Sequence, residues 1–185
     1  MADSKFRPLS FSMFLTQFGA CFIGEKLRWL RFLLGDILQP ADLSNDADIA
    51  ITLLQKLVVK GKIKEEDVCL LREIAELIEI QDAKDLLSKY AQNDPYQFQL
   101  ISRERSAIFK ALRAFNKTGK VTDMKILAGH YKLVDHEFTN EWDLIFHLEM
   151  YVWPTKKEEY LEEFHALINP QAQHVLVDTL AGKGT

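Results

Sequence analysis

The chain is poor in the residues that mark several protein classes. Its 185 residues include only 8 glycines and 5 prolines, and 48% are hydrophobic, which argues against a disordered or fibrous chain. Two cysteines, Cys21 and Cys69, are too few for a disulfide scaffold and fit a reducing compartment, so we expect a cytoplasmic protein. Basic residues are not in excess: 23 Lys and Arg against 27 Asp and Glu give a net charge of -4, which disfavours nucleic acid as a partner.

Long hydrophobic runs are also missing. No stretch approaches the ~20 uninterrupted apolar residues that a membrane-spanning helix needs, so no membrane partner is expected. The apolar stretch 11–24 lacks the basic leader and the small-residue cleavage site of a secretory signal. Its apolar residues follow the spacing of one helix face: Phe11, Phe14, Leu15 and Phe18. We therefore expect an amphipathic helix that begins at Phe11.

Helical periodicity runs through the rest of the sequence, and strand-like alternation is scarce. The apolar spacing predicts further helices over 25–38, 46–60, 64–79 and 81–90. A short turn at 41–43 brings the total to six elements. Gly61 is expected to end the helix 46–60. The clearest apolar stripe consists of Val68, Leu71, Ala75 and Ile78, widened by Ile74 and Leu77. The predicted fold class is all-α.

The second half of the chain repeats the pattern of the first. An offset of 90 carries Leu71, Glu73, Leu77 and Ile78 onto Leu161, Glu163, Leu167 and Ile168. An offset of 91 carries Leu53, Leu54 and Leu57 onto Leu144, Ile145 and Leu148. We therefore expect two packed six-helix units, 1–92 and 97–182, that contact each other because the linker 92–96 is short.

The predicted helix 25–38 carries two aromatic residues away from its apolar stripe. Five aliphatic residues cluster on one side at ~100° per residue: Leu27, Leu30, Leu34, Ile37 and Leu38. Phe32 lies almost opposite, and Trp29 lies more than a right angle away, beside Arg28. One interpretation is that both aromatics are buried against another helix of the same unit or against the second unit. The other is that they form an exposed apolar anchor for a partner.

The first unit resembles a death effector domain. Phe32 and Leu33 are similar to the Phe-Leu pair with which that family docks, and Glu25 and Asp85 are similar to the two acids of its charge triad. The Arg of the triad is replaced by Ala83, with Lys84 beside it, so the triad is incomplete.

In the second unit Ile126 and Leu127 replace the Phe-Leu pair, and the run 173–177 lacks the last-helix motif. The resemblance implies a set of partner-binding residues: Phe32, Leu33, Trp29, Arg28, Glu25, Asp85, Ile126 and Leu127.

A tandem pair of such units resembles short, viral-type FLIP proteins and the prodomains of initiator caspases. A protease segment with a Cys nucleophile is expected to be absent, because the chain ends at Thr185 without such a motif. The resemblance implies a non-enzymatic regulator of death-receptor apoptosis, which docks onto an adaptor or an initiator procaspase and blocks or retunes caspase activation. A viral source would make this a host–virus interaction. Inhibition and promotion of apoptosis use the same docking surface, so the sequence does not decide whether the chain inhibits or promotes apoptosis.

Charge is distributed unevenly in the second unit. Residues 102–132 contain 8 Lys and Arg against 2 Asp and Glu, a net of +6, whereas residues 135–165 contain 2 against 9, a net of -7. Opposite poles on one module favour head-to-tail docking. The alternative is that the two poles neutralise each other within the unit.

Three other functions stay open at this stage. The second unit could be a divergent death domain, which would make the chain a Fas-associated-type adaptor; the run 121–126 and Trp153 favour this. A helical metalloenzyme would use His130 and His136, but their spacing matches no metal motif, so no metal or cofactor is expected. The segment 95–99 (PYQFQ) faintly resembles a peptide bound by TRAF-type adaptors, although a plain linker explains it better.

Overall fold

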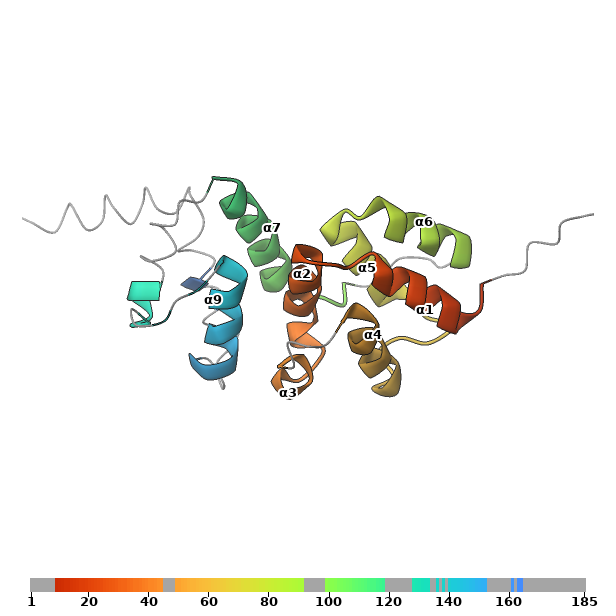
Figure 1. Ribbon diagram of the computed structural model, residues 1–185, viewed down its shortest axis with the longest axis horizontal. Coiled ribbons are helices and arrows are strands. Elements are labelled where there is room, and N and C mark those ends of the chain that lie inside the picture. The colour runs from red at the N-terminus through yellow and green to blue at the C-terminus, as the bar shows by residue number, and fades with distance from the viewer. Residues whose placement is uncertain are drawn as a thin grey trace, which may run out of the picture. The chain divides into compact units, whose positions relative to one another are not determined.

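The computed structural model describes residues 9–44, 49–91, 99–118, 128–133, 136, 138, 140–152, 161 and 163–164. These residues form helices and no strand, with one isolated antiparallel bridge between Lys64 and Asp67 (Figure 1). The prediction of an all-α chain is confirmed for this part of the sequence. Contacts divide the chain into two compact units, Met1–Ile101 and Ser102–Thr185. The predicted bounds 1–92 and 97–182, and the number of helices in each unit, stay predictions.

The described part of the first unit contains six α-helices and one 3-10 turn. They are α1 (Phe11–Ala20), α2 (Glu25–Leu33), the turn η1 (Leu34–Asp36), α3 (Pro40–Leu43), α4 (Ala50–Val59), α5 (Cys69–Ile78) and α6 (Gln81–Tyr90). Helix α1 packs against α4 and α6, α2 and α6 pack against α5, and α3 packs against α4. The predicted stripe lies in this core, where Val68, Leu71, Ile74, Ala75 and Ile78 are buried; Leu77 is half-buried.

Short polar signals set where several of these helices begin and end. The Ser10 hydroxyl accepts a hydrogen bond from the Met13 amide at 3.3 Å, which caps the start of α1. Gly61 follows α4 with φ 65°, and the Lys62 amide donates to the Leu57 carbonyl at 2.8 Å, so the predicted end at Gly61 is confirmed. The prediction that the next helix begins at residue 64 is wrong. Helix α5 begins at Cys69, whose amide donates to the Asp67 carboxylate at 3.2 Å.

The prediction of one continuous helix over 25–38 is also wrong in its second half. Helix α2 ends at Leu33, and the chain continues as the 3-10 turn η1. The Ile37 and Leu38 amides both donate to the Leu34 carbonyl, at 2.9 and 2.8 Å. A 3-10 turn rotates about 120° per residue rather than 100°. Positions 34–38 therefore cannot be projected on the same helical wheel as positions 25–33.

The last helix of the first unit closes onto its first helix. Phe14 of α1 stacks on Tyr90 of α6, with ring centroids 4.2 Å apart and planes 11° from parallel. The Tyr90 hydroxyl donates to the Glu65 carbonyl at 3.1 Å. Tyr90 therefore joins α6 both to α1 and to the loop that precedes α5.

The described part of the second unit contains α7 (Arg103–Thr118), α9 (Glu141–His147) and the π-helical turn η2 (Leu148–Val152). Helix α7 packs against α9. Three residues matched by the repeat, Leu144, Ile145 and Leu148, are all buried. Residues 119–127 and 165–185, which include the predicted matches Leu167 and Ile168, lie outside the described residues.

Gly19 sets how closely α1 approaches α4. A Cβ atom at Gly19 would lie 3.2 Å from the backbone nitrogen of Ile51 and 3.3 Å from its Cα. We expect Gly19→Val to lower the free energy of unfolding by about 2 kcal/mol, because the added carbons press on the backbone of α4. Urea denaturation measures the loss. Ala20→Val, at the exposed neighbouring position, is the control and should cost about 0.5 kcal/mol. Equal losses would contradict close packing at Gly19.

Candidate docking surface

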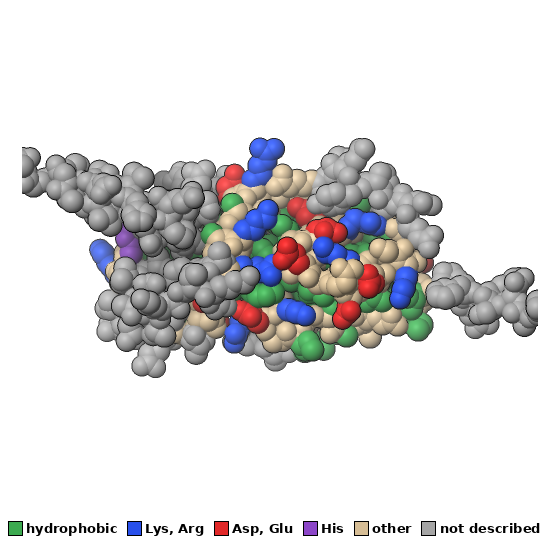
Figure 2. All heavy atoms as spheres, turned by 90° about the horizontal axis from the view of Figure 1, so that it is seen from above, with side chains coloured by type: hydrophobic (Ala, Val, Ile, Leu, Met, Phe, Trp, Pro, Cys, Tyr) green, Lys and Arg blue, Asp and Glu red, His purple; other side chains and the backbone are tan. Residues whose placement is uncertain are grey.

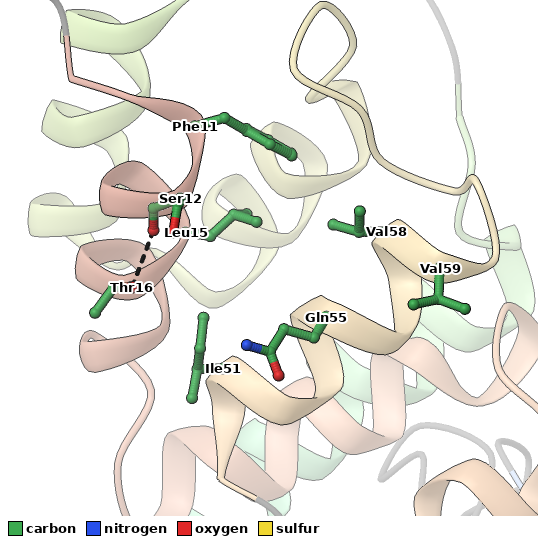
Figure 3. Close-up of a pocket in the computed structure, with 8 residues that line it drawn as sticks. All are labelled: Phe11, Ser12, Leu15, Thr16, Ile51, Gln55, Val58 and Val59. Carbon is green, nitrogen blue, oxygen red and sulfur yellow. Dashed lines mark hydrogen bonds between the residues drawn. The ribbon is translucent and has the colours of Figure 1, made fainter.

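An open apolar groove of about 430 Å³ lies between α1 and α4 (Figure 3). Four residues of α1 line one wall and four of α4 line the other: Phe11, Ser12, Leu15, Thr16, Ile51, Gln55, Val58 and Val59. Leu15 lies at the base and is buried, whereas Ser12, Thr16 and Gln55 are exposed. The Thr16 hydroxyl donates to the Ser12 carbonyl at 2.9 Å, so this polar group is satisfied within α1.

The walls of the groove are uncharged. Helix α1 has no charged residue, and the charged residue of α4, Lys56, does not line the groove. The Lys56 ammonium donates instead to the Asp42 carbonyl on α3 at 2.6 Å. A neutral, largely apolar groove fits an apolar ridge of a partner better than a charged peptide.

One wall of the groove carries a strongly exposed apolar side chain. Val59, at the end of α4, lines the groove and is 87% exposed. Single exposed apolar residues are ordinary on a protein surface, but a contiguous apolar area commonly marks an interaction site. The groove therefore forms the candidate docking surface of the first unit.

The predicted anchor on α2 is not exposed. Phe32 is 4% exposed and Leu33 is fully buried, which contradicts the interpretation of Phe32 as an outward-facing knob. The prediction failed because it assumed that the side of a helix opposite its leucine stripe faces water. Helix α2 buries Leu30 and Phe32 although they lie on different sides, as a helix covered on more than one side does.

The other predicted residues of the first unit lie at varied depths. Glu25, Arg28 and Asp85 are exposed, and Trp29 is half-buried. Asp85 accepts a hydrogen bond from the Gln81 side-chain amide at 2.8 Å within α6.

Lys84, beside the missing arginine of the triad, forms a 2.8 Å ion pair with Glu76 of α5. Lys84 thus connects α6 to α5, whereas Asp85 is bonded within α6. The corresponding residues of the second unit, Ile126 and Leu127, lie outside the described residues, as does the TRAF-like segment up to residue 98.

An ion pair and a histidine–carboxylate contact connect the basic and acidic parts of the second unit. The Arg105 guanidinium makes two hydrogen bonds to the Glu149 carboxylate, at 2.5 and 3.4 Å, and its side chain is fully buried. The His130 ring lies 2.9 Å from the Glu163 carboxylate. The Arg105–Glu149 ion pair joins the basic segment to the acidic one, which favours neutralisation within the unit over head-to-tail docking.

The two histidines of the metalloenzyme alternative each contact a different residue. His130 contacts Glu163, whereas His136 lies against His147, with ring centroids 4.8 Å apart. Burial, and secondly the neighbouring His136, lowers the pKa of His147. Among the described residues no three His, Cys, Asp or Glu side chains are grouped as a metal ion requires.

Charges of both signs are interspersed on the face shown in Figure 2. No helix in the described ranges combines the length and the apolar character needed to cross a bilayer. Comparison of the chain with models of protein families, with curated proteins and with solved structures gives no match.

The groove between α1 and α4 was missed by sequence reasoning. The signal available was the absence of charge from α1, combined with exposed small polar residues at Ser12 and Thr16. Periodicity could not use that signal, because it assigns one buried face to each helix and does not tell which helices become neighbours.

Proposed function

We propose that the chain is a non-enzymatic regulator of death-receptor apoptosis, built from two packed death-effector-like units and acting in the cytoplasm. It docks onto the death effector module of an adaptor or an initiator procaspase and blocks or retunes caspase activation. The observation that carries the proposal is the open, uncharged groove between α1 and α4 in the helical first unit.

In this proposal the chain receives an apolar ridge instead of inserting one. Phe32 and Leu33 are buried, so they do not supply the knob. The resemblance to death effector domains suggests what binds in the groove. The Phe-Leu pair on a helix of the partner's death effector module is an apolar ridge of the kind that a neutral groove accepts. Burial of a Phe or a Leu side chain contributes roughly 1.5–3 kcal/mol, enough for the pair to dominate a micromolar contact.

Thr16→Arg tests the docking groove. A guanidinium at this exposed wall position would face the apolar ridge and would lose hydration on binding. We expect the affinity for a purified death effector module of an adaptor to fall at least tenfold, which corresponds to about 1.4 kcal/mol. Titration calorimetry with the full chain measures the affinity, and circular dichroism confirms that the helical content is unchanged.

Gln17→Arg is the matched control, since Gln17 is the next residue of α1, is exposed and does not line the groove. It should bind as the unmodified chain does. Equal binding by Thr16→Arg would exclude the groove as the docking surface. Binding of the unmodified chain to receptor death-domain tails, and not to death effector modules, would overturn the proposed function.

A further inference from the structure

The segment that connects the two units is held at both ends by neighbouring residues of α5. Before the segment, the Arg72 guanidinium donates to the carbonyl of Ala91 at 2.8 Å. After it, the Glu73 carboxylate accepts hydrogen bonds from the amides of Leu100, at 2.7 Å, and Ile101, at 3.1 Å. All five residues belong to the first compact unit.

Glu73 is unusual among the acidic residues of α5 because it is buried. Its exposed fraction is 3%, whereas Glu76 on the same helix is exposed and pairs with Lys84 at the surface. A buried carboxylate is costly unless hydrogen bonds compensate its lost hydration. In the described part of the chain, both hydrogen bonds that Glu73 accepts come from the backbone of residues 100 and 101. The burial of Glu73 therefore depends on keeping that backbone in place.

Ile101 strengthens the attachment. Its side chain is fully buried, so the chain is fixed there by apolar packing as well as by its amide. Each oxygen of the Glu73 carboxylate takes one of two successive amides, and such charge-assisted bonds are stronger than neutral ones. The repeat gives no second copy of this arrangement: Glu163, which matches Glu73 in sequence, is exposed and contacts His130.

We propose that Arg72 and Glu73 form a clasp that holds both ends of the connecting segment on α5 and so sets the length of the tether between the two units. With the clasp closed, the free chain toward the second unit starts after Ile101. When the Glu73 half of the clasp opens and Arg72 still holds Ala91, it starts after Ala91. At ~3.3 Å per residue, release of residues 92–101 adds roughly 30 Å of reach at full extension. Tether length governs the effective concentration of two linked modules, so the clasp controls how strongly the units act together.

Hydrogen exchange on the full-length chain tests the clasp. Glu73→Gln keeps the side-chain shape but removes the charge and one acceptor oxygen. We expect the amides of Leu100 and Ile101 to exchange at least tenfold faster, while the amides of Leu53 and Leu71, in the helical core, exchange as before. Tryptic cleavage after Lys89 and Arg103, which flank the held segment, should accelerate by a similar factor. Arg72→Gln should accelerate the cleavage after Lys89.

Glu76→Gln is the matched control on the same helix and should leave both measurements unchanged. Unchanged exchange at Leu100 and Ile101 in Glu73→Gln would overturn the clasp. A uniform rise in exchange that includes Leu53 and Leu71 would also overturn it, because Glu73 would then stabilise the whole unit and not the attachment of the segment. Neither result depends on the docking groove, whose variants are measured separately.

Discussion

Replacing Phe32 with Asp is expected to lower the free energy of unfolding by about 4 kcal/mol or more. Loss of a buried Phe costs about 3–5 kcal/mol, and a carboxylate in its place adds a cost for lost hydration. Phe32 is 4% exposed, so both costs apply. Urea denaturation followed by far-ultraviolet circular dichroism measures the effect. Any loss of docking in this variant would then follow from unfolding and would not identify Phe32 as a contact.

Two controls separate burial from a general effect on α2. Lys26→Asp places the same charge at an exposed position of the helix and should change the free energy of unfolding by less than about 0.5 kcal/mol. Phe32→Leu keeps an apolar side chain and should cost about 1–2 kcal/mol. An unchanged urea midpoint for Phe32→Asp would show that Phe32 faces water and would restore the knob on α2.

The second large effect is expected at the buried ion pair between Arg105 of α7 and Glu149 of η2. Glu149→Ala leaves the guanidinium of Arg105 buried without its carboxylate, and removing one partner of a buried pair costs about 3–5 kcal/mol. The loss should be measured as a change in the free energy of unfolding of the second unit. The fluorescence of Trp142, which is buried on α9, offers a probe within that unit.

A double variant makes the prediction sharper. Arg105→Met with Glu149→Met replaces the pair by apolar side chains and should restore most of the lost stability, because it removes the cost of burying two charges. Glu104→Gln, next to Arg105 but exposed, should change the free energy by less than about 0.5 kcal/mol. A loss below about 1 kcal/mol for Glu149→Ala would indicate that water reaches the guanidinium of Arg105.

Local patterns predicted the helices well where one face alone is buried. The helix at 81–90 has the predicted bounds, and the stripe from Val68 to Ile78 lies in the core. The prediction failed at α2, where apolar side chains cover more than one side and a 3-10 turn changes the angle per residue at Leu34. A helical wheel contains neither fact, since both depend on what packs against the helix.

The candidate docking surface depends on pairing between distant segments, which periodicity does not give. Gly19 and Ile51 approach closely enough to place α1 beside α4, and the groove follows from that contact. Because periodicity does not give the pairing of distant segments, it also could not predict that Glu73 and Glu163 have different environments. The repeat gives them equal positions, yet one is buried against the backbone of residues 100 and 101 and the other is exposed beside His130.

The contact between Phe14 and Tyr90 has a topological consequence. Because α1 and α6 pack side by side, the first turn of α1 and the last turn of α6 are neighbours. A module with adjacent ends can be duplicated in series, or inserted into a loop of a host protein, without threading through its own interior. This geometry suits the helical bundle Phe11–Tyr90 to insertion into a loop of a host protein and to circular permutation at these two ends.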